Sequence, residues 1–336
     1  MPERLVRGLR KGLKRPSAFV GVLFAVLLVA NLVTIPQFVS GSNIAGTLAI
    51  AAPFVIAAMA STPPVLSGGG GIDLSVGPVL GFVNVLLIAW LLPNGLAAPQ
   101  IAIPLLLLFG ALVGVLNGVL VAVVRLQPIV ATLGTYLVLV GLALEVMPQP
   151  IGEAPTWIVR FGGSIVGIPG AVILVAVPLV AWILLRRTSY ATALYSVGGD
   201  ARVAFSAGIN VSRVRIMAYV ISGVFAAIAG LALTALIESG DPNLGPQYTL
   251  VAIAAVALGG TSLAGGRGGI AGPILGALTI FLIQNLLSAV HVSALWLQVV
   301  YGAILVIALI ANSQVRTLAR RRPATRAEPS TIGPSA

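Results

Sequence analysis

The sequence contains no cysteine, which excludes several kinds of site at once. Disulfide bonds, zinc–thiolate sites, iron–sulfur clusters and cysteine nucleophiles all require that residue. A single histidine, His291, likewise excludes a metal cage built from several histidines. His291 also has no orienting acid beside it, so a Ser–His–Asp set is not indicated. The sequence therefore predicts no metal site and no catalytic residue.

Charged residues are scarce. Asp, Glu, Lys and Arg make up 8% of the 336 residues, whereas 58% are hydrophobic. A soluble globular domain uses roughly 25% charged residues to cover its surface. This composition requires a solvent that tolerates apolar surface, which is a lipid bilayer. A soluble enzyme, a secreted domain and a disordered protein are excluded. The net charge of +11 does not indicate nucleic acid, because the positive charges flank apolar runs.

Lysine is almost absent, since Lys11 and Lys14 are the only two. A phosphate-binding P-loop needs a lysine and a Ser or Thr after its last glycine. The glycine-rich segments 259–262 and 265–269 have no such lysine. We therefore expect that the chain is not an enzyme, carries no ATPase of that kind and binds no cofactor.

Apolar runs are abundant, and about 20 residues suffice to span a bilayer as a helix. They predict an all-α, polytopic membrane protein with about ten transmembrane helices, some of them broken or short. The expected spans are Ala18–Thr34, Ile44–Val65, Leu74–Leu92, Ile101–Val124, Ile129–Met147, Ala171–Leu185, Ile216–Ile237, Thr249–Leu263, Ala271–Val290 and Ser293–Ala311. Proline breaks helices, so Pro63 and Pro64 are expected to end the second span.

The basic residues predict the orientation, because cytoplasmic loops are enriched in Lys and Arg. With the N-terminus in the cytoplasm, 18 of the 19 basic residues lie in the tails and cytoplasmic loops, and only Arg160 does not. We therefore expect both termini in the cytoplasm. The expected organisation is a basic cytoplasmic tail (1–17), a transmembrane domain (18–312) with a cytoplasmic loop at 186–215, and a basic, flexible cytoplasmic tail (313–336).

Ionisable residues are nearly absent from the expected spans, where only Asp73 and Glu145 lie near span ends. Ion-coupled carriers usually keep paired ionisable groups inside the membrane, so ion coupling is not indicated. Neutral polar side chains do occur in the spans. They either hydrogen-bond between helices or line a pathway for a hydroxyl-rich solute. The candidates for pathway lining are Asn84, Asn117, Thr135, Tyr136 and Asn285.

A glycine run, Gly68–Gly71, precedes Asp73 at the start of the third span. Glycine allows backbone conformations closed to other residues and close approach of neighbouring helices. Asp73 has two interpretations. It either caps the helix by accepting orphan amide hydrogens near the positive end of the helix dipole, or takes part in a cytoplasmic gate.

The loop 186–215 contains the pattern of a short helix. Asp200 is placed to cap a helix at Ala201–Ala207, and Gly208 to stop it in the left-handed conformation. Such a short helix needs a surface to dock against. Its apolar side chains allow two partners, the lipid surface or a soluble protein.

Three ordered motifs resemble those of a known family. Segment 70–77 (GGIDLSVG) is similar to the signature of permease subunits of ribose-type bacterial ABC importers, in the branched-chain amino acid/ribose permease superfamily. Segment 258–268 (LGGTSLAGGRG) resembles the second signature of that family. VGGD at 197–200, followed by AGINV at 207–211, has the family's order and spacing. The resemblance covers roughly residues 18–312. The glycine run is longer than usual, which leaves open how tightly the second and third spans join.

The resemblance implies residue roles. It assigns coupling to an ATPase to Asp200, Ala201, Arg202, Val203, Ala204, Phe205, Ala207, Gly208 and Ile209. The signature loops, which would form the gate, contain Gly70, Gly71, Asp73, Ser75, Gly77, Gly259, Gly260, Thr261, Gly265, Gly266 and Gly268.

The resemblance also implies partners. A dimer with a second copy or a paralogue would form the pathway among the lipids of the bacterial inner membrane. Cytoplasmic ATPase subunits would bind ATP and Mg, and a periplasmic or lipid-anchored solute-binding protein would deliver a sugar, polyol or sugar-like signal. The expected function is thus the multi-pass permease subunit of an ATP-driven importer. The alternative is a self-sufficient facilitator or secondary carrier for a small neutral solute.

The expected orientation is open to a direct test, because the native chain has no cysteine to interfere. A single cysteine introduced at Asp241 should react with an impermeant thiol reagent from outside only, and one at Asp200 from the cytoplasm only. Labelling of position 241 from the cytoplasmic side alone would overturn the orientation.

Overall fold

The computed structural model describes residues 16–292, except 39 and 42, and of the later residues only 296, 299, 302, 303 and 306. The expected tenth span, Ser293–Ala311, lies almost entirely outside the described residues. So do nearly all of the N-terminal tail and all of the C-terminal tail.

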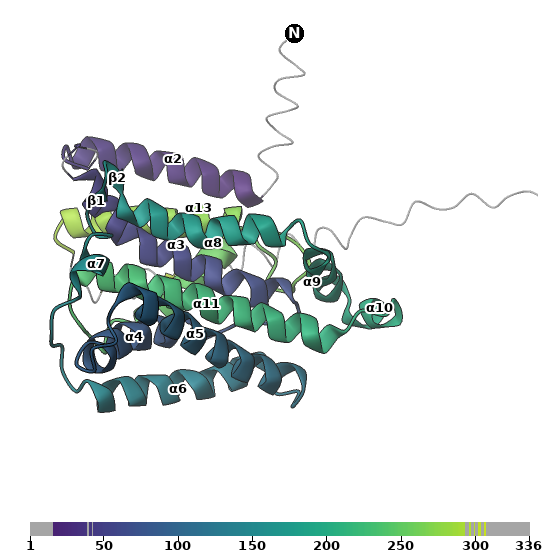
Figure 1. The fold of residues 1–336 in the computed structure, drawn as a ribbon. Coiled ribbons are helices and arrows are strands. Elements are labelled where there is room, and N and C mark those ends of the chain that lie inside the picture. The colour runs from purple at the N-terminus through teal and green to yellow at the C-terminus, as the bar shows by residue number, and fades with distance from the viewer. Residues whose placement is uncertain are drawn as a thin grey trace, which may run out of the picture.

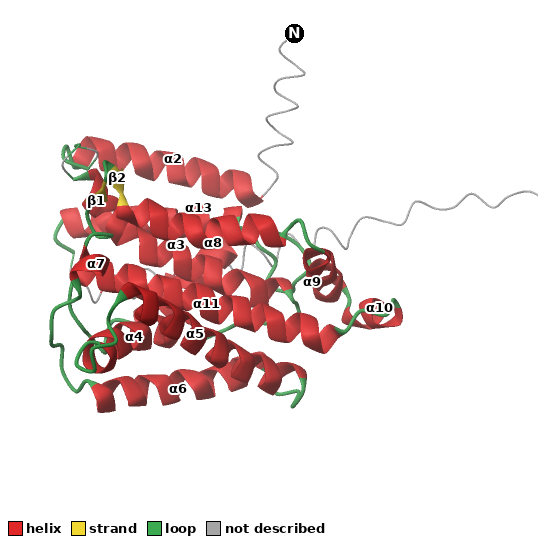
Figure 2. Ribbon diagram, in the orientation of Figure 1, coloured by secondary structure: helices red, strands yellow, loops and turns green. Residues whose placement is uncertain are grey.

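The described chain is mostly helical, with 71% helix and 2% strand, which confirms the predicted helical class. Its elements are α2 (Pro16–Thr34), α3 (Ile44–Leu66), α4 (Val76–Val85), the π-helix η1 (Leu86–Leu91), α5 (Pro99–Ala122), α6 (Pro128–Val146), α7 (Thr156–Val159), β1 (Ser164–Ile165), β2 (Ile168–Pro169), α8 (Gly170–Leu185), α9 (Ser189–Gly199), α10 (Ala201–Ser206), α11 (Val211–Ile237), α12 (Gln247–Leu258) and α13 (Ala271–Ala289). The strands form only a two-residue antiparallel hairpin (Figure 2).

The long helices lie side by side and run between two ends of one bundle (Figure 1). We call the end with α9 and α10 the α10 end, and the opposite end, with α7 and the hairpin, the β end. Five helices, α3, α5, α6, α11 and α13, are long and apolar enough to cross a membrane. Helices α8 and α9 meet this test only together, and α9 bends away from α8 by 84°. Shorter apolar helices occur at Val20–Thr34, Val76–Leu91 and Gln247–Leu258.

Several helices differ from their expected bounds. Helix α11 begins at Val211, five residues before the expected start, because Asn210 caps it there, and the expected third span is divided into α4 and η1. Helix α3 continues through Pro63 and Pro64 to Leu66, because protein buries its last turns and the Ser67 amide bonds to the carbonyls of both prolines. Irregular backbone survives in a membrane where protein covers it. Helix α12 ends at Leu258, five residues before the expected end, because Gly259 and Gly260 interrupt it.

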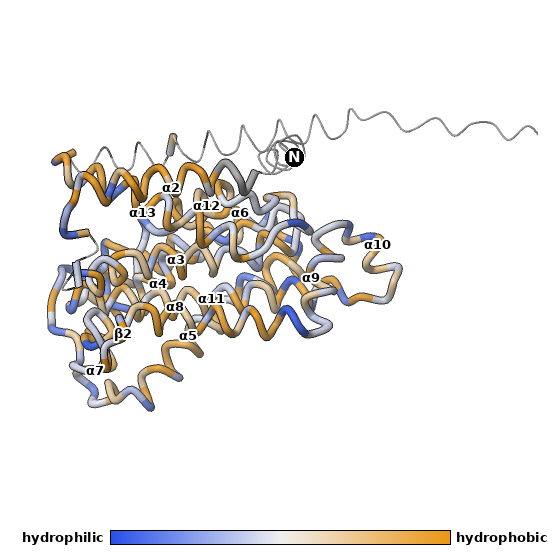
Figure 3. The backbone as a smooth tube through the Cα atoms, turned by 90° about the horizontal axis from the view of Figure 1, so that it is seen from above, coloured by the Kyte–Doolittle hydropathy of each residue, from blue (hydrophilic) through white to orange (hydrophobic). Residues whose placement is uncertain are grey.

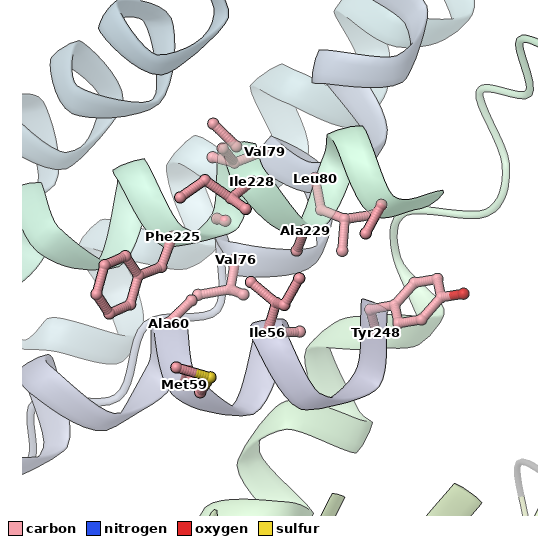
Figure 4. Close-up of a cluster of buried hydrophobic side chains, with 14 of the residues drawn as sticks. Ile56, Met59, Ala60, Val76, Val79, Leu80, Phe225, Ile228, Ala229 and Tyr248 are labelled. Atoms are coloured by element: carbon pink, nitrogen blue, oxygen red, sulfur yellow. The ribbon is translucent and has the colours of Figure 1, made fainter. Parts of the chain in front are cut away.

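The core is centred on α3 and α11, with α4 and α12 packed against them. Figure 4 shows side chains from these four helices meeting, among them Ile56 of α3, Leu80 of α4, Ile228 of α11 and Tyr248 of α12. All four are buried. The outward faces of the peripheral helices are also apolar, although they are exposed, as at Leu137 and Val138 of α6. Figure 3 shows this apolar colour along the helices, with hydrophilic segments mainly toward the two ends. This is the pattern of a bundle surrounded by lipid.

Glycines bring α5 and α11 into backbone contact. Gly110, Gly114 and Gly118 lie four residues apart on α5, and a Cβ on any of them would collide with α11 backbone. Gly223 of α11 in turn lies against the Gly110 carbonyl. Without a hydrophobic driving force between helices in lipid, small residues that allow close packing hold such pairs together.

We call this contact of Gly110, Gly114 and Gly118 with α11 the seam, and it should be sensitive to a single added methyl group. Gly223→Ala should destabilise the bundle by about 1–3 kcal/mol, the usual cost of overpacking, and lower its melting temperature in detergent. The control is Gly134→Ala in α6, where a Cβ meets no described atom within 4 Å. That change should be neutral or slightly stabilising, because alanine favours helix. Equal melting temperatures for the two variants would contradict the seam.

Candidate gate and coupling region

Three glycine-rich segments from distant parts of the sequence meet at the α10 end. They are the loop after α3, the end of α9 and the loop after α12. Gly198 lies so close to Leu66 and Gly266 that a Cβ would come within 2.5 Å of the Gly266 nitrogen. The Gly266 amide donates to the Leu66 carbonyl at 3.1 Å. One backbone-to-backbone contact therefore joins the end of α3 and Gly68 to Gly198 and Gly199 of α9 and to Gly265 and Gly266 of the loop after α12, and we call it the glycine joint.

The glycine run closes the turn from α3 to α4. Gly68, Gly69 and Gly70 have φ values of +74°, +66° and +74°, the left-handed region that favours glycine. Gly71 packs directly against the Pro64 carbonyl, and its amide donates to the Gly68 carbonyl at 3.2 Å. The long glycine run therefore makes a compact turn between α3 and α4.

The second signature loop folds back on itself. The Thr261 hydroxyl donates to the Gly269 carbonyl at 3.0 Å, and Gly268, at φ +115°, packs against Thr261. Gly259 lies against Gly272 at the start of α13. Gly77, from the first signature, instead packs against Thr249 and Gly245 around the start of α12.

Asp73 lies inside the protein, with 3% of its surface exposed. Its Oδ1 accepts from the Ser75 amide at 2.9 Å and the Ser75 hydroxyl at 2.6 Å. Its Oδ2 accepts from the Ser222 hydroxyl of α11 at 2.8 Å. Burial raises the pKa of Asp73, and the hydrogen bonds from Ser75 and Ser222 act against that rise. The carboxylate holds Ser75, the N-cap residue of α4, but makes no cap hydrogen bond to the helix itself, and it fastens this turn to α11.

The polar contacts extend from Asp73 across two more helices. Asn117 of α5 donates to the Ser75 hydroxyl at 2.8 Å and accepts from Thr135 of α6 at 2.6 Å. One chain of hydrogen bonds thus crosses α11, α4, α5 and α6. Tyr136, next to Thr135, is half-buried.

Two other candidates for pathway lining also bond between elements. Asn84 of α4 donates to the Thr234 hydroxyl at 2.9 Å and accepts from the Asp241 amide at 2.9 Å. Asn285 of α13 donates to Asn31 of α2 at 2.9 Å. Interhelical bonding thus accounts for four of the five candidates.

The loop after α9 has the expected caps. Asp200 accepts from the amides of Arg202 and Val203 at 2.8 and 3.2 Å. The helix ends at Ser206, one residue before the expected end. Gly208 has φ +82°, its amide donates to the Phe205 carbonyl, and the Ile209 amide donates to the Ala204 carbonyl. These two bonds form a Schellman motif.

Helix α10 projects from the bundle (Figure 1). Val203 and Phe205 are 66% and 73% exposed, whereas Ala204 is buried. Two tyrosines of α9 fix the base of this projection. Tyr190 donates to the Val214 carbonyl at 3.3 Å and Tyr195 to the Gly268 carbonyl at 3.1 Å. Burial raises the pKa of both hydroxyls.

Sequence reasoning missed several residues of this region. Ser222 and Thr234 are polar positions in the apolar run of α11, which was a usable signal for contacts of Asp73 and Asn84. Gly198 was part of a quoted motif but received no role. Asn31 had no signal beyond being polar in an apolar span. Within the described residues, no group of three or more His, Cys, Asp or Glu side chains could hold a metal.

A bundle of long apolar helices with buried interhelical hydrogen bonds has the architecture of a multi-pass membrane protein. The family model of the branched-chain amino acid transport system permease component matches residues 43–309, more than half of the chain. The chain therefore belongs to this permease family, whose members are transporter membrane subunits and not enzymes. This places it in the bacterial inner membrane as a multi-pass protein.

Curated relatives match over most of their length. The chain is 36% identical to the ribose import permease protein RbsC of Bacillus subtilis, over 89% of this chain and 92% of that protein. It is 39% identical to the probable ABC transporter permease protein YphD of Escherichia coli, over 87% of each chain. It is 32% identical to the fructose import permease protein FrcC of Rhizobium meliloti, over 74% of this chain and 72% of that protein. No solved structure gives a significant match.

Two buried serines test the Asp73 contacts. Ser222→Ala should lower stability by about 1–3 kcal/mol, because it leaves a buried carboxylate oxygen unpaired. The control is Ser61→Ala, since the buried Ser61 hydroxyl has no hydrogen-bond partner within the described part of the chain. That change should leave the melting temperature in detergent unchanged or raise it. If Ser222→Ala behaves like Ser61→Ala, Asp73 does not depend on this bond.

Proposed function

We propose that this permease subunit forms the translocation pathway of an ATP-driven importer for a small hydroxylated solute, such as a sugar, polyol or sugar-like signal. The observation that carries the proposal is the glycine joint, in which the second signature and the VGGD segment meet the glycine run that precedes the first signature, next to α10. The named solutes of two relatives, ribose and fructose, support the solute class. Family membership favours this function over a self-sufficient facilitator.

The proposed orientation puts the α10 end in the cytoplasm. Seven of the eight described arginines belong to segments at that end: Arg125, Arg186, Arg187, Arg202, Arg213, Arg215 and Arg267. Arg160, beside α7, belongs to the β end with Glu153, Glu238 and Asp241. This asymmetry supports cytoplasmic termini under the positive-inside rule. The proposal keeps ten spans, in which α12 is a short helix preceded by a non-helical segment that packs against α4 at Gly245.

Helix α10 is proposed as the element that couples to the ATPase. Its exposed Val203 and Phe205 offer an apolar contact, and its two caps fix it as a rigid unit. The ATPase subunits, not this chain, would bind ATP and Mg. A solute-binding protein would approach the β end from outside.

The pathway is proposed to run along an interface with a second copy or a paralogue. Buried side chains such as Ile56, Leu80 and Ile228 fill the centre of the bundle, so its axis is an unsuitable route. Asn84, Asn117, Thr135, Tyr136 and Asn285 stay predicted as pathway residues. Four of them would have to exchange an existing hydrogen bond for one to the solute.

Gly208 provides the test. Together with the partner ATPase and solute-binding protein in liposomes, the wild-type chain should give ATP-dependent uptake, and the chain alone should give none. Gly208→Val should abolish uptake, because a β-branched residue in the left-handed conformation costs about 1–2 kcal/mol and disrupts the stop of α10. Membrane abundance should not change, since a Cβ at Gly208 meets none of the described atoms within 4 Å.

The matched control is Gly208→Asn. Asparagine tolerates the left-handed conformation, so uptake should be largely retained. Loss of ATPase association in the valine variant alone would locate the defect at α10. Normal uptake and association in Gly208→Val would show that α10 is only a lipid-surface helix, and ATP-independent accumulation by the chain alone would refute the importer.

A further inference from the structure

A cavity of about 950 Å³ lies at the α10 end, beside the glycine joint. The glycine run, the loop between α5 and α6, α10 and the first turns of α11 surround it. Its inner wall includes buried residues such as Ser67 and Gly71, and its outer rim includes exposed ones such as Arg125. The function proposed above gives this cavity no role.

The charge around the cavity has one sign. Arg125, Arg202 and Arg215 line it, and no Asp or Glu is among the described residues that line it. The two described carboxylates at this end already accept hydrogen bonds elsewhere, Asp73 from serines and Asp200 from amides of α10. Gly69 makes room for one guanidinium, because a Cβ there would come within 2.8 Å of Arg215 Nη2. The glycine run therefore shapes the cavity around an arginine.

Two polar atoms in this wall are buried without a partner. The Tyr219 hydroxyl is on a side chain with 0% exposure, and neither it nor Arg215 Nε has a hydrogen-bond partner among the residues that the structure describes. A buried donor without an acceptor costs about 1–3 kcal/mol. Both residues line the cavity, so an oxygen-rich anion bound there would give both donors an acceptor.

We propose that this cavity binds the phosphate of an anionic phospholipid headgroup. Basic pockets between transmembrane helices on the cytoplasmic side favour such headgroups. The cavity rim favours a lipid over free phosphate, because the residues next to Arg125 in the sequence are apolar and exposed. Val123, Val124 and Leu126 are the residues that acyl chains would contact.

The test uses the full-length chain in detergent, titrated with short-chain phosphatidylglycerol, phosphatidylcholine or inorganic phosphate. Binding is measured as the rise in melting temperature, from which an apparent Kd follows. Phosphatidylglycerol should stabilise the protein and phosphatidylcholine should not. Arg215→Gln should weaken the apparent affinity about fivefold or more, the effect of about 1 kcal/mol per arginine.

Matched variants separate binding from folding. Arg213→Gln removes the same charge two residues away, at an exposed position outside the cavity, and should change the affinity less than twofold. Tyr219→Phe removes only the unpartnered hydroxyl. It should weaken phosphatidylglycerol binding about fivefold, while the melting temperature without lipid stays equal or rises.

The outcomes are decisive. Equal phosphatidylglycerol affinity in wild type, Arg215→Gln and Tyr219→Phe would overturn the proposal, as would an equal loss in Arg213→Gln. If inorganic phosphate stabilises the protein with the same variant dependence and phosphatidylglycerol does not, the lipid assignment is wrong and the cavity takes a soluble phosphate. Uptake and ATPase association do not enter the measurement, so its result is independent of the proposed transport function.

Discussion

Direct contact between backbones, without side chains between them, is the constraint on which this structure depends. In lipid, helices gain little from hiding apolar surface, so close approach and interhelical hydrogen bonds must hold the bundle together. Glycines supply the approach twice, along the seam between α5 and α11 and at the glycine joint. The buried Asp73 adds a hydrogen bond beside the glycine contact, since its partner Ser222 precedes Gly223 of the seam. The polar chain and the seam both join α5 to α11, so packing and hydrogen bonding reinforce the same helix pair.

The sequence was sufficient to predict the helical class and the approximate position of most described helices, because apolar length is a strong signal in a membrane protein. It also identified the caps of α10, since Asp200 and Gly208 act through local backbone geometry. Helix ends were less predictable where tertiary contacts decide them. Pro63 and Pro64 end a helix in water, but burial by neighbouring segments allows α3 to continue. The early end of α12 depends on Gly259 and Gly260, which lie inside an apolar run that predicts one continuous helix.

The site was harder to foresee, because its contacts join residues far apart in the chain. Asp73 carried a visible signal, yet its partner Ser222 lies 149 positions away. A serine in an apolar helix indicates a hydrogen bond but not the acceptor. The glycines of the joint were all visible as motifs, but no local pattern states that Leu66, Gly198 and Gly266 meet. The same limit applies to the arginines around the cavity, whose shared position follows only from the fold.

The position of α10 relative to the joint has a mechanical consequence. Helix α9 has 11 residues, so it is a stiff rod about 16 Å long whose last turn is wedged into the joint at Gly198. The backbone of Gly199 also packs in the joint, because a Cβ on Gly266 would come within 2.7 Å of the Gly199 Cα. Only Asp200 therefore separates the clamped end of α9 from the first residue of α10. A push on α10 is transmitted within a few residues to the turn between α3 and α4.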